Sequence, residues 1–447
     1  MRDQADDIGF VGKDGRTDAL VEKCAESPAG PRLWALSEIR SPGLVAKCGE
    51  AGVKKVDDLC DLTVLIKWAD EVKPSLVIIG PEEPLAAGAA DALKEHGIPC
   101  FGPTKDLARI ESSKTWARRL VDTHGIPGNP DYRCFEGPEG LEAHLRRMQE
   151  FVIKPDGLTG GKGVRVYPEH FESFEEAVQY AIDNIEGGRV LVEELLEGEE
   201  FSLMTITDGE SVVHCPVVQD HKRSEAGDTG PNTGGMGSYS CADFSMPFLL
   251  EEEVQAAQRI NEMVIEAVRQ SKSEPYRGVL YGGFMATRDG IRLIEYNCRF
   301  GDPEALNVLP IITGDFVELA HAVASGGLSE VRVGFEHKAT VCKYVVPAGY
   351  PNGKGQGDPI EVPADLLEDP RIRIYWASAE MTESGAVLTG SRALGVVGLG
   401  DDLPEAEELA EKAASRIVGP VRHREDIGTA SLVARRVEHM DRIRRAP

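Results

Sequence analysis

Short apolar segments alternate with helical patterns over the first hundred residues, and this alternation is the strongest constraint on the fold. DIGFV (7–11) and SLVIIG (75–80) have the length of strands, while TDALVEKCAES (17–27) has helical spacing. Strands that alternate with helices predict a parallel sheet covered by helices. Ligands of such sheets bind beyond the carboxyl ends of the strands, which makes the turns 12–15 and 80–84 candidate binding loops.

The pattern changes near residue 151. FVIKP (151–155) and GVRVY (163–167) are predicted strands joined by a glycine-rich turn, and IRLIEYN (291–297) completes a hairpin at Arg288–Gly290. The last hundred residues contain strands followed by a helical segment and form one more α+β unit that starts near residue 330. The chain therefore combines an α/β domain with α+β domains.

The composition excludes several classes of function. There are 75 acidic and 49 basic residues, giving a formal net charge of −26. This excess argues against a general nucleic-acid binder or a basic membrane-surface protein. Nine cysteines without a C-x-x-C pair, and no apolar run of membrane-spanning or signal-peptide type, favour reduced cytosol. Only 18 of the basic residues are lysines, so a segment that gathers lysines is informative.

The segment from Lys154 to Gly163 places two of the scarce lysines beside four glycines. Glycines let backbone N–H groups approach an anion closely, and lysines supply point charges for phosphate oxygens. The segment is not a Walker A loop, because Lys162 is followed by Gly163 and then by a strand. It is consistent with a glycine-rich lid over phosphates, or with a solvated hairpin that carries two surface lysines.

Strand alternation in IRLIEYNCR places Glu295, Asn297 and Arg299 on one face, opposite Ile294 and Tyr296. A carboxylate and an amide oxygen two residues apart suit Mg²⁺, which shares such ligands with substrate phosphates. The alternative is a polar solvent face on an edge strand. The turn FGDPE, which follows directly and brings more carboxylates near, favours the metal site.

A third candidate segment, VLVEELLEGEE, ends a predicted strand at Glu193 and Glu194. Exposed backbone groups at a strand end can bind an adenine edge, and a nearby carboxylate can accept ribose hydroxyls. The alternative is a solvated acidic loop. The early turn GKDGR (12–16) lacks the third glycine of G-x-G-x-x-G and is weak support for nucleotide binding by itself.

Eight motifs occur in a fixed order: GPEEPLAAG, ESSK, VIKPDGLTGGKGV, EELLEGEEFS, QDHKR, GDTGPNTGGMG, YRGVLYGGFM and IEYNCRFGDPE. In this order they make the sequence resemble the phosphoribosylamine–glycine ligase family of the ATP-grasp superfamily. The resemblance extends from about residue 80 to HREDIG near residue 428 and is weaker before it. QDHKR, GDTGPNTGGMG and NCRFGDPE are specific to this family within the superfamily.

The resemblance implies an α/β and α+β multidomain fold: an N-terminal Rossmann-like domain (1–103), an ATP-grasp domain (104–328) with an inserted lid (about 122–191), and a C-terminal α+β domain (329–447). It implies ATP-dependent joining of glycine to 5-phosphoribosylamine through glycyl phosphate, which yields glycinamide ribonucleotide, ADP and phosphate in purine biosynthesis. ATP with Mg²⁺ or Mn²⁺ are the implied cofactors, and a cytoplasmic monomer with small-molecule partners alone is expected.

The resemblance also assigns residues to roles. The implied ATP site consists of Lys114, Lys154, Gly160, Gly161, Lys162, Gly163, Glu193, Glu194, Leu195, Leu196 and Glu200. The implied substrate site consists of Gly12, Gly15, Arg16, Glu82, Pro84, Asp228, Thr229, Gly230, Asn232, Gly234, Gly235, Met236 and Arg299. The implied metal ligands are Glu295 and Asn297, and the implied catalytic residues are Arg299, Lys154 and Asp228.

The first loop departs from the family pattern G-x-G-G-R-E-H-A-L. Thr17 and Asp18 stand in place of the Glu-His pair, and Lys13 and Asp14 replace small residues. This departure motivates an alternative, a diverged ATP-grasp ligase that acts on another amine. A nucleotide-binding scaffold without catalysis is a further alternative, against which the chain retains both lysines of the glycine-rich segment, Glu295, Asn297 and Arg299.

Overall fold

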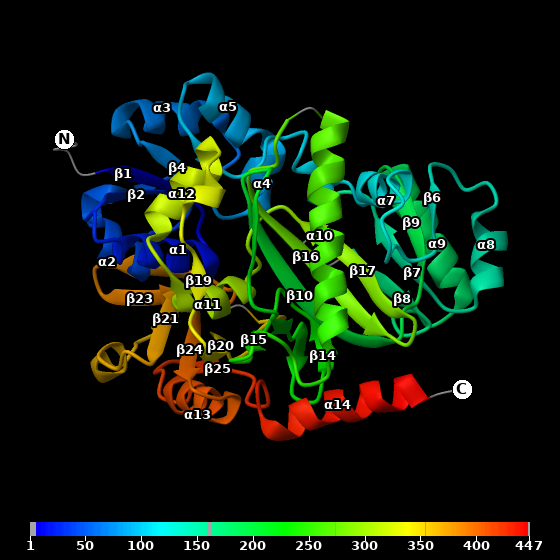
Figure 1. Cartoon of the computed structure of the whole chain (residues 1–447). Helices are drawn as coiled ribbons and strands as arrows, with labels where there is room; N and C mark the ends of the chain where they lie inside the picture. The colour runs from blue at the N-terminus through cyan, green and yellow to red at the C-terminus, as the bar shows by residue number, and fades with distance from the viewer. Residues whose placement is uncertain (1–5, 159–162, 273, 354, 446–447) are drawn as a thin grey trace.

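The computed structural model describes residues 6–158, 163–272, 274–353 and 355–445. In these ranges the chain forms four larger sheets and three two-stranded ribbons. In Figure 1, the N-terminal region, the lid, the sheet of the central body and the C-terminal region follow one another from blue to red. The multidomain α/β and α+β architecture predicted from the sequence is confirmed.

The N-terminal region is a parallel sheet in the order β3-β2-β1-β4-β5 with helices around it. Its central strands are almost wholly buried, as expected for a parallel sheet covered on both faces. The Rossmann-like prediction is therefore confirmed. The elements are β1 (Asp7–Val11), α1 (Gly15–Ala25), β2 (Arg32–Ser37), α2 (Pro42–Cys48), η1 (Glu50–Gly52), β3 (Val53–Lys55), α3 (Leu62–Val72), β4 (Leu76–Ile79), α4 (Glu82–Ala87), α5 (Ala89–Glu95) and β5 (Cys100–Phe101).

The central body is built on an antiparallel sheet in the order β11-β10-β16-β17, against which the long helix α10 packs. Helices α6 and α7 connect this sheet to the preceding domain. The elements are α6 (Arg109–Ser112), α7 (Lys114–Thr123), β10 (Gly198–Thr207), β11 (Val212–His214), β13 (Arg223–Glu225), β14 (Thr229–Asn232), α10 (Glu251–Lys272), β16 (Gly278–Thr287), β17 (Gly290–Asn297), α11 (Glu304–Val308), η2 (Leu309–Ile311), β18 (Ile312–Thr313), α12 (Phe316–Ser325), η3 (Leu328–Glu330) and β19 (Gly334–Phe335).

The lid is a separate lobe at the right of Figure 1. Its sheet has the order β6-β9-β7-β8 and packs its own core, which includes Phe135, Leu145, Phe151 and Val192, against two helices. An independent core allows the lobe to move as a unit. The elements are β6 (Tyr132–Phe135), α8 (Leu141–Met148), β7 (Phe151–Pro155), β8 (Arg165–Tyr167), α9 (Phe174–Glu186) and β9 (Val190–Glu194).

The C-terminal sheet has the order β12-β15-β20-β24-β21, with β25 beside β20. Two of its strands, β12 (Gln219–Asp220) and β15 (Gly237–Ser240), come from the central segment. The sheet therefore contains strands from both sides of the boundary expected at 328/329. The remaining elements are β20 (Ala339–Pro347), η4 (Ala364–Leu367), β21 (Ile372–Trp376), β22 (Ala379–Thr382), β23 (Gly385–Leu388), β24 (Leu394–Gly400), α13 (Leu403–Ala414), β25 (Val421–Arg422) and α14 (Ala430–Arg445).

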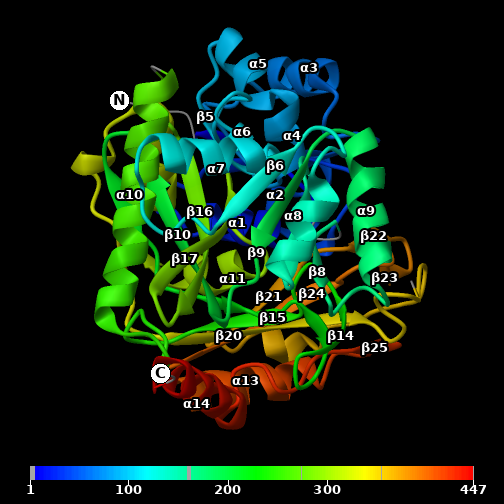
Figure 2. The ribbon, with the colours of Figure 1, turned by 90° about the vertical axis from the view of Figure 1, so that its right-hand side faces the viewer.

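Helix α14 returns from the C-terminal region to the central body. It packs against β10 and β16, and Figure 2 shows it at the lower edge of the molecule. Among the described helices, none is long and apolar enough to cross a membrane.

Candidate active site

Strand β17 carries a β-bulge close to the site. Gly283 of β16 lies opposite Glu295, whereas the next residue of β16, Phe284, lies opposite Leu293. Ile294 is therefore the extra residue. Buried positions change from odd to even numbers across it, because one inserted residue reverses the alternation of a strand.

The bulge directs Glu295, Asn297 and Arg299 to one face, opposite the buried Tyr296. The predicted alternation placed Ile294 with Tyr296, but Ile294 lies in the bulge and lines the same pocket as Glu295. Strict alternation could not foresee this, since a bulge has no clear sequence signal here.

Arg118 of α7 holds the bulge in place. Its two terminal nitrogens donate to the carbonyl oxygens of Leu293 at 3.0 Å and of Ile294 at 2.7 Å. The same guanidinium donates to both carboxylate oxygens of Glu193, at 2.8 and 2.9 Å. Lys154 of β7 lies 2.7 Å from Glu193 and donates to the carbonyl of Ile294 at 3.1 Å.

Glu193 is thus the centre of a buried ion-pair cluster with Arg118 and Lys154. Although burial alone raises the pKa of its carboxyl, the two cations lower it to about 2. The sequence prediction placed Glu193 beside adenine; in the structure, its carboxylate bonds to these two side chains. Its role toward adenine stays a prediction.

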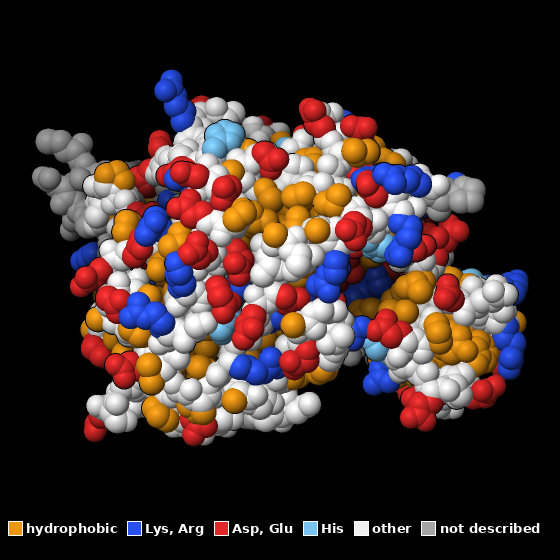
Figure 3. Space-filling view, turned by 90° about the horizontal axis from the view of Figure 1, so that it is seen from below, with side chains coloured by type: hydrophobic (Ala, Val, Ile, Leu, Met, Phe, Trp, Pro, Cys, Tyr) orange, Lys and Arg blue, Asp and Glu red, His pale blue; other side chains and the backbone are white. Residues whose placement is uncertain are grey.

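A small pocket lies between β10, β16 and β17. It is lined by Glu200, Ser202, Asp220, Lys222, Tyr281 and Glu295 among others. Figure 3 shows a groove between the lid lobe and the rest of the molecule, with lysine and arginine side chains in its depth. This groove places cations where the sequence predicted the anionic substrates.

Glu295 is a carboxylate of this pocket without a protein partner among the described residues. Within the described chain, no hydrogen bond or ion pair engages its side chain, yet it is half-buried. Burial favours the protonated form, but Lys222, Lys154 and Lys114 hold the pKa of Glu295 below its usual range. An ionised, unpaired carboxylate surrounded by cations is suited to a divalent cation that bridges to phosphates.

Lys114 stands at the entrance of the glycine-rich segment. It is the first residue of α7, and its ammonium donates to the carbonyls of Pro155 at 3.2 Å and Gly157 at 2.7 Å. Burial lowers the pKa of Lys114. The carbonyl of Gly163 accepts from Tyr180 at 2.8 Å. The predicted ATP-contacting residues Gly160, Gly161 and Lys162 lie outside the described residues.

The connection from β9 to β10 was predicted to hold adenine and ribose. Leu195 is exposed and Leu196 is partly buried. Glu200 is also exposed, and its carboxylate lies 3.8 Å from the ammonium of Lys222. Glu194 accepts the backbone N–H of Asp131 at 2.8 Å and is therefore engaged next to β6.

Arg299 belongs to a chain of alternating charges that joins the two predicted substrate loops. Its guanidinium donates to Glu82 at 2.9 Å and to Glu111 at 2.8 Å, and Arg16 lies 3.7 Å from the same carboxylate of Glu82. Burial raises the pKa of Glu111 to about 7 despite the opposing charge of Arg299. Pro84, on α4 next to Glu82, is buried. The structure thus brings Arg16, Glu82 and Arg299 together, and their role toward the substrates stays a prediction.

The altered residues of the first loop are accommodated by packing. Asp14 caps α1 by accepting the N–H of Thr17 at 2.8 Å. A Cβ on Gly12 would lie 2.1 Å from the hydroxyl oxygen of Thr17, so Gly12 leaves room for this threonine. A Cβ on Gly15 would lie 2.3 Å from the Tyr344 hydroxyl, which shows that the C-terminal domain covers this turn.

Asp18 points away from the loop and toward the C-terminal domain. Its carboxylate is fully buried, accepts the N–H of Trp376 at 2.9 Å and lies 3.1 Å from Lys47. The substitution that made the substrate uncertain therefore forms a domain contact.

The glycine-rich loop 228–236 is fastened from the C-terminal domain. Arg392 donates to the carbonyls of Gly234 at 2.8 Å and Gly235 at 3.0 Å, and it lies 3.3 Å from the carboxylate of Asp302. Met236 is buried. The remaining predicted positions of the loop are exposed, namely Thr229, Gly230 and Asn232.

Comparisons with known proteins agree with this arrangement over nearly the whole chain. Three models of phosphoribosylglycinamide synthetase match in succession: the N domain at 6–111, the ATP-grasp (A) domain at 112–305 and the C domain at 340–430. A phosphoribosylamine–glycine ligase of Methanocella arvoryzae is 41% identical over 434 residues, which are 97% of this chain and 99% of that protein. The chain belongs to the phosphoribosylamine–glycine ligase family. The ligase of Methanocaldococcus jannaschii is 43% identical over 447 residues, 98% of this chain and 100% of that one.

Solved structures extend the likeness. The phosphoribosylamine–glycine ligase from Thermotoga maritima has a TM-score of 0.76 and 26% identity, and the match covers 94% of this chain and all of that one. A biotin carboxylase from Campylobacter jejuni has a TM-score of 0.72 at 14% identity, covering 98% of this chain and 99% of that one. The second likeness shows the shared fold alone.

Several residues of the family site were not assigned from the sequence. Lys222 and Asp220 lie in the QDHKR motif, which was noted as a family mark without a role for each side chain. Arg118 follows the ESSK motif by four residues, and its helical position could have suggested that it faces the same way as Lys114. Arg392 comes from the C-terminal domain, and no spacing rule connects it to residue 234.

Proposed function

We propose that this chain joins glycine to 5-phosphoribosylamine at the expense of ATP, giving glycinamide ribonucleotide, ADP and phosphate. The observation that carries the proposal is the half-buried Glu295, unpaired within the described chain, among Lys114, Lys154 and Lys222, in a chain that matches ligases of this family over nearly its full length. Carboxylate activation by ATP needs this combination of an ionised metal ligand and phosphate-binding cations.

The reaction proceeds in two steps. The carboxylate of glycine attacks the γ-phosphorus of ATP, which releases ADP and forms glycyl phosphate. The amine of phosphoribosylamine then attacks the acyl carbon, and phosphate leaves as the amide bond forms. Lys114 and Lys154 neutralise charge on the transferring phosphoryl group, and Arg299 positions the anionic substrates between the 80–84 turn and the body.

A divalent cation fits the residues present. Glu295 offers an unpaired carboxylate and Asn297 an amide oxygen on the same strand face. No group of three or more His, Cys, Asp or Glu side chains suited to a metal occurs among the described residues. Glu295 and Asn297 would hold Mg²⁺ or Mn²⁺, which would neutralise charge on the phosphates.

The lid supports the same scheme. Its glycine-rich segment follows β7, which carries Lys154, so closure of the lobe would cover the phosphates and keep water from glycyl phosphate. We further propose that the protein acts as a monomer in the cytoplasm. Sedimentation at micromolar concentration and fractionation of cells test these two points.

The decisive experiment measures ADP release with ATP, glycine and phosphoribosylamine, omitting each in turn. We expect ADP release to require both glycine and the amine. Glu295→Gln should reduce turnover by about 100-fold or more, which is the order of magnitude expected when one electrostatic contact to the transition state is lost. Glu252→Gln, at an exposed position of α10, is the matched control and should match the parent. Absence of glycine-dependent ADP release refutes the proposal.

The competing reading, another amine substrate, is tested in the same assay. It rested on the altered residues Thr17 and Asp18, of which the second forms a domain contact. If another primary amine supports ADP release tenfold better than phosphoribosylamine at equal concentration, the amine specificity proposed here is wrong. The proposal that glycine is the carboxylate substrate is then retained.

A further inference from the structure

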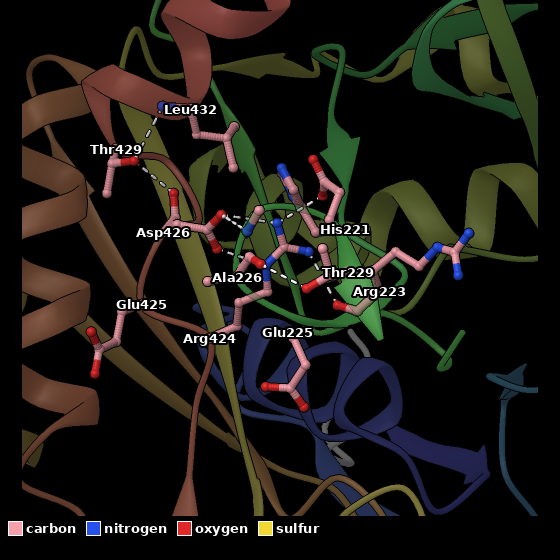
Figure 4. Close-up of polar contacts among 12 residues, drawn as sticks. His221, Arg223, Glu225, Ala226, Thr229, Arg424, Glu425, Asp426, Thr429 and Leu432 are labelled. Atoms are coloured by element: carbon pink, nitrogen blue, oxygen red, sulfur yellow. Dashed lines mark hydrogen bonds and ion pairs between the residues drawn. The ribbon is translucent and has the colours of Figure 1, made fainter. Parts of the chain in front are cut away.

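The glycine-rich loop is held at its first residue by two arginines from the C-terminal segment. Arg424 donates to one carboxylate oxygen of Asp228 at 2.7 Å, and Arg436 donates to the other at 2.5 Å. Figure 4 shows Arg424 and Asp426 of the C-terminal segment beside Arg223 and Thr229 of the central hairpin. Two arginines on one carboxylate form charge-assisted hydrogen bonds that fix both its position and its orientation.

The backbone conformation of Asp228 is one that such contacts stabilise. Asp228 has a φ of +59°, in the left-handed region that residues other than glycine rarely adopt. The preceding Gly227 donates its N–H to the carboxylate of Asp426 at 2.9 Å, and Asp426 in turn accepts from Arg424 at 2.6 Å. The turn is therefore held through its side chain and through its backbone by the same C-terminal segment.

Arg424 connects this turn to the strand before it. Its side chain is completely buried, and its third donor reaches the carbonyl of Arg223 at 3.1 Å. The β13–β14 hairpin is consequently bound at the start of β13 and at the last residue of its turn. A fully buried guanidinium that bonds Asp228, Asp426 and a backbone carbonyl cannot shift without leaving charges unpaired.

Arg436 connects the same turn to strand β10. It lies on α14, and besides Asp228 its guanidinium lies 3.3 Å from the carboxylate of Glu199 on β10. His439, one turn further along α14, bonds to Glu199 at 2.6 Å. Glu199 directly precedes Glu200, which the sequence assigns to ribose. Helix α14 thus contacts Asp228 and the strand that carries Glu200, although Glu199 and Glu200 point to opposite faces of that strand.

We propose that Arg424 and Arg436 are positioning residues that set the conformation of the substrate loop 228–236 by holding Asp228. This inference rests on the proposed function, and it changes the role of Asp228. The carboxylate that the sequence assigned to catalysis is bonded on both oxygens to these arginines. Asp228 then acts through the shape of the loop, and the C-terminal helix becomes part of substrate recognition.

The test uses Arg436→Gln, Asp228→Asn and the double variant in the full-length protein. Arg436 is partly exposed and contributes no core packing, so this variant should fold. Each single variant should raise the KM for glycine or for phosphoribosylamine about tenfold, with kcat and the KM for ATP changed less than twofold. The double variant should be no worse than Asp228→Asn alone, because Asp228→Asn already removes the contact with Arg436.

Three controls separate the contacts of Arg436. Arg436→Lys keeps a charge and should recover at least half of the lost affinity. Glu199→Gln removes the other partner and should leave the KM values for glycine and phosphoribosylamine within twofold. Arg445→Gln removes an exposed arginine whose ion pair, within the described part of the chain, is with Asp441 of the same helix, and it should match the parent.

Hydrogen exchange of the 223–237 peptide gives a readout that needs no activity. Arg436→Gln and Asp228→Asn should each speed its exchange about tenfold, whereas Arg445→Gln should not. If exchange and KM values both stay at parental levels, the inference is overturned. If exchange accelerates while the parent shows no glycine-dependent ADP release, the loop is held as described and the proposed function alone fails.

Discussion

The buried ion-pair cluster of Glu193 gives the sharpest prediction. Glu193→Gln preserves the size of the side chain but removes the negative charge between Arg118 and Lys154. Holding the pKa of this carboxyl at about 2 rather than 4.5 corresponds to about 3 kcal/mol of stability at neutral pH. The loss of an anion between two buried cations leads to the same order of destabilisation.

The pH dependence has a definite sign. Because the folded pKa lies below the unfolded value, the stabilisation is fully present above pH 4.5 and is lost as the pH falls toward 2. The difference between the parent and Glu193→Gln should therefore be constant from pH 8 to pH 5 and should narrow below pH 4.5. Urea unfolding, followed by the fluorescence of Trp116 two residues before Arg118, measures it.

The same variant separates the structural role from adenine binding. Glu194→Gln is the matched control, since its carboxylate accepts only the N–H of Asp131 and it should lose less than 1 kcal/mol. If Glu193→Gln keeps the parental unfolding free energy and instead raises the KM for ATP more than tenfold, the carboxylate serves the nucleotide, and the reasoning from the ion pairs is refuted.

Three further predictions address the domain contacts and the charge. Asp18→Asn should change the KM for phosphoribosylamine less than twofold, because the carboxylate faces Trp376, and a fivefold rise would place it at the substrate instead. Lys343→Met should lower the unfolding free energy of the C-terminal domain by about 2 kcal/mol, since its fully buried ammonium bonds Glu407 and Glu411; an unchanged thermal transition would contradict this. The net charge of −26 predicts a higher melting temperature in molar KCl than in dilute buffer, and a flat or falling trend in differential scanning calorimetry would count against a salt-adapted surface.

The sequence predicted the fold class because periodicity and turn residues are local properties. The parallel N-terminal sheet followed from alternating strands and helices, and the β16–β17 hairpin followed from the turn at 288–290. The partners of short strands did not follow. Strand β15 joins the C-terminal sheet although it precedes that domain by a hundred residues, and such pairing depends on the packed structure.

The candidate site was predictable where one motif carries the chemistry. Glu295, Asn297 and Arg299 were found together because they lie two residues apart on one strand. The partners that hold charged groups were not found, since Arg118 meets Glu193 across 75 residues and Arg424 meets Asp228 across 196. Burial and pairing of charges are decided by the fold, and a motif cannot reveal them.

The bulge at Ile294 determines which face of β17 carries Glu295. Straightening β17 without shortening it would turn Glu295 toward the apolar interior and Ile294 and Tyr296 toward the groove, whereas deleting Ile294 would restore regular alternation and leave Glu295 on the groove face. A two-residue change would keep the faces but break the register with β16. Engineered libraries that shorten this strand should therefore tolerate loss of Ile294 better than loss of its neighbours, and other insertions and deletions should accumulate in the loops around it.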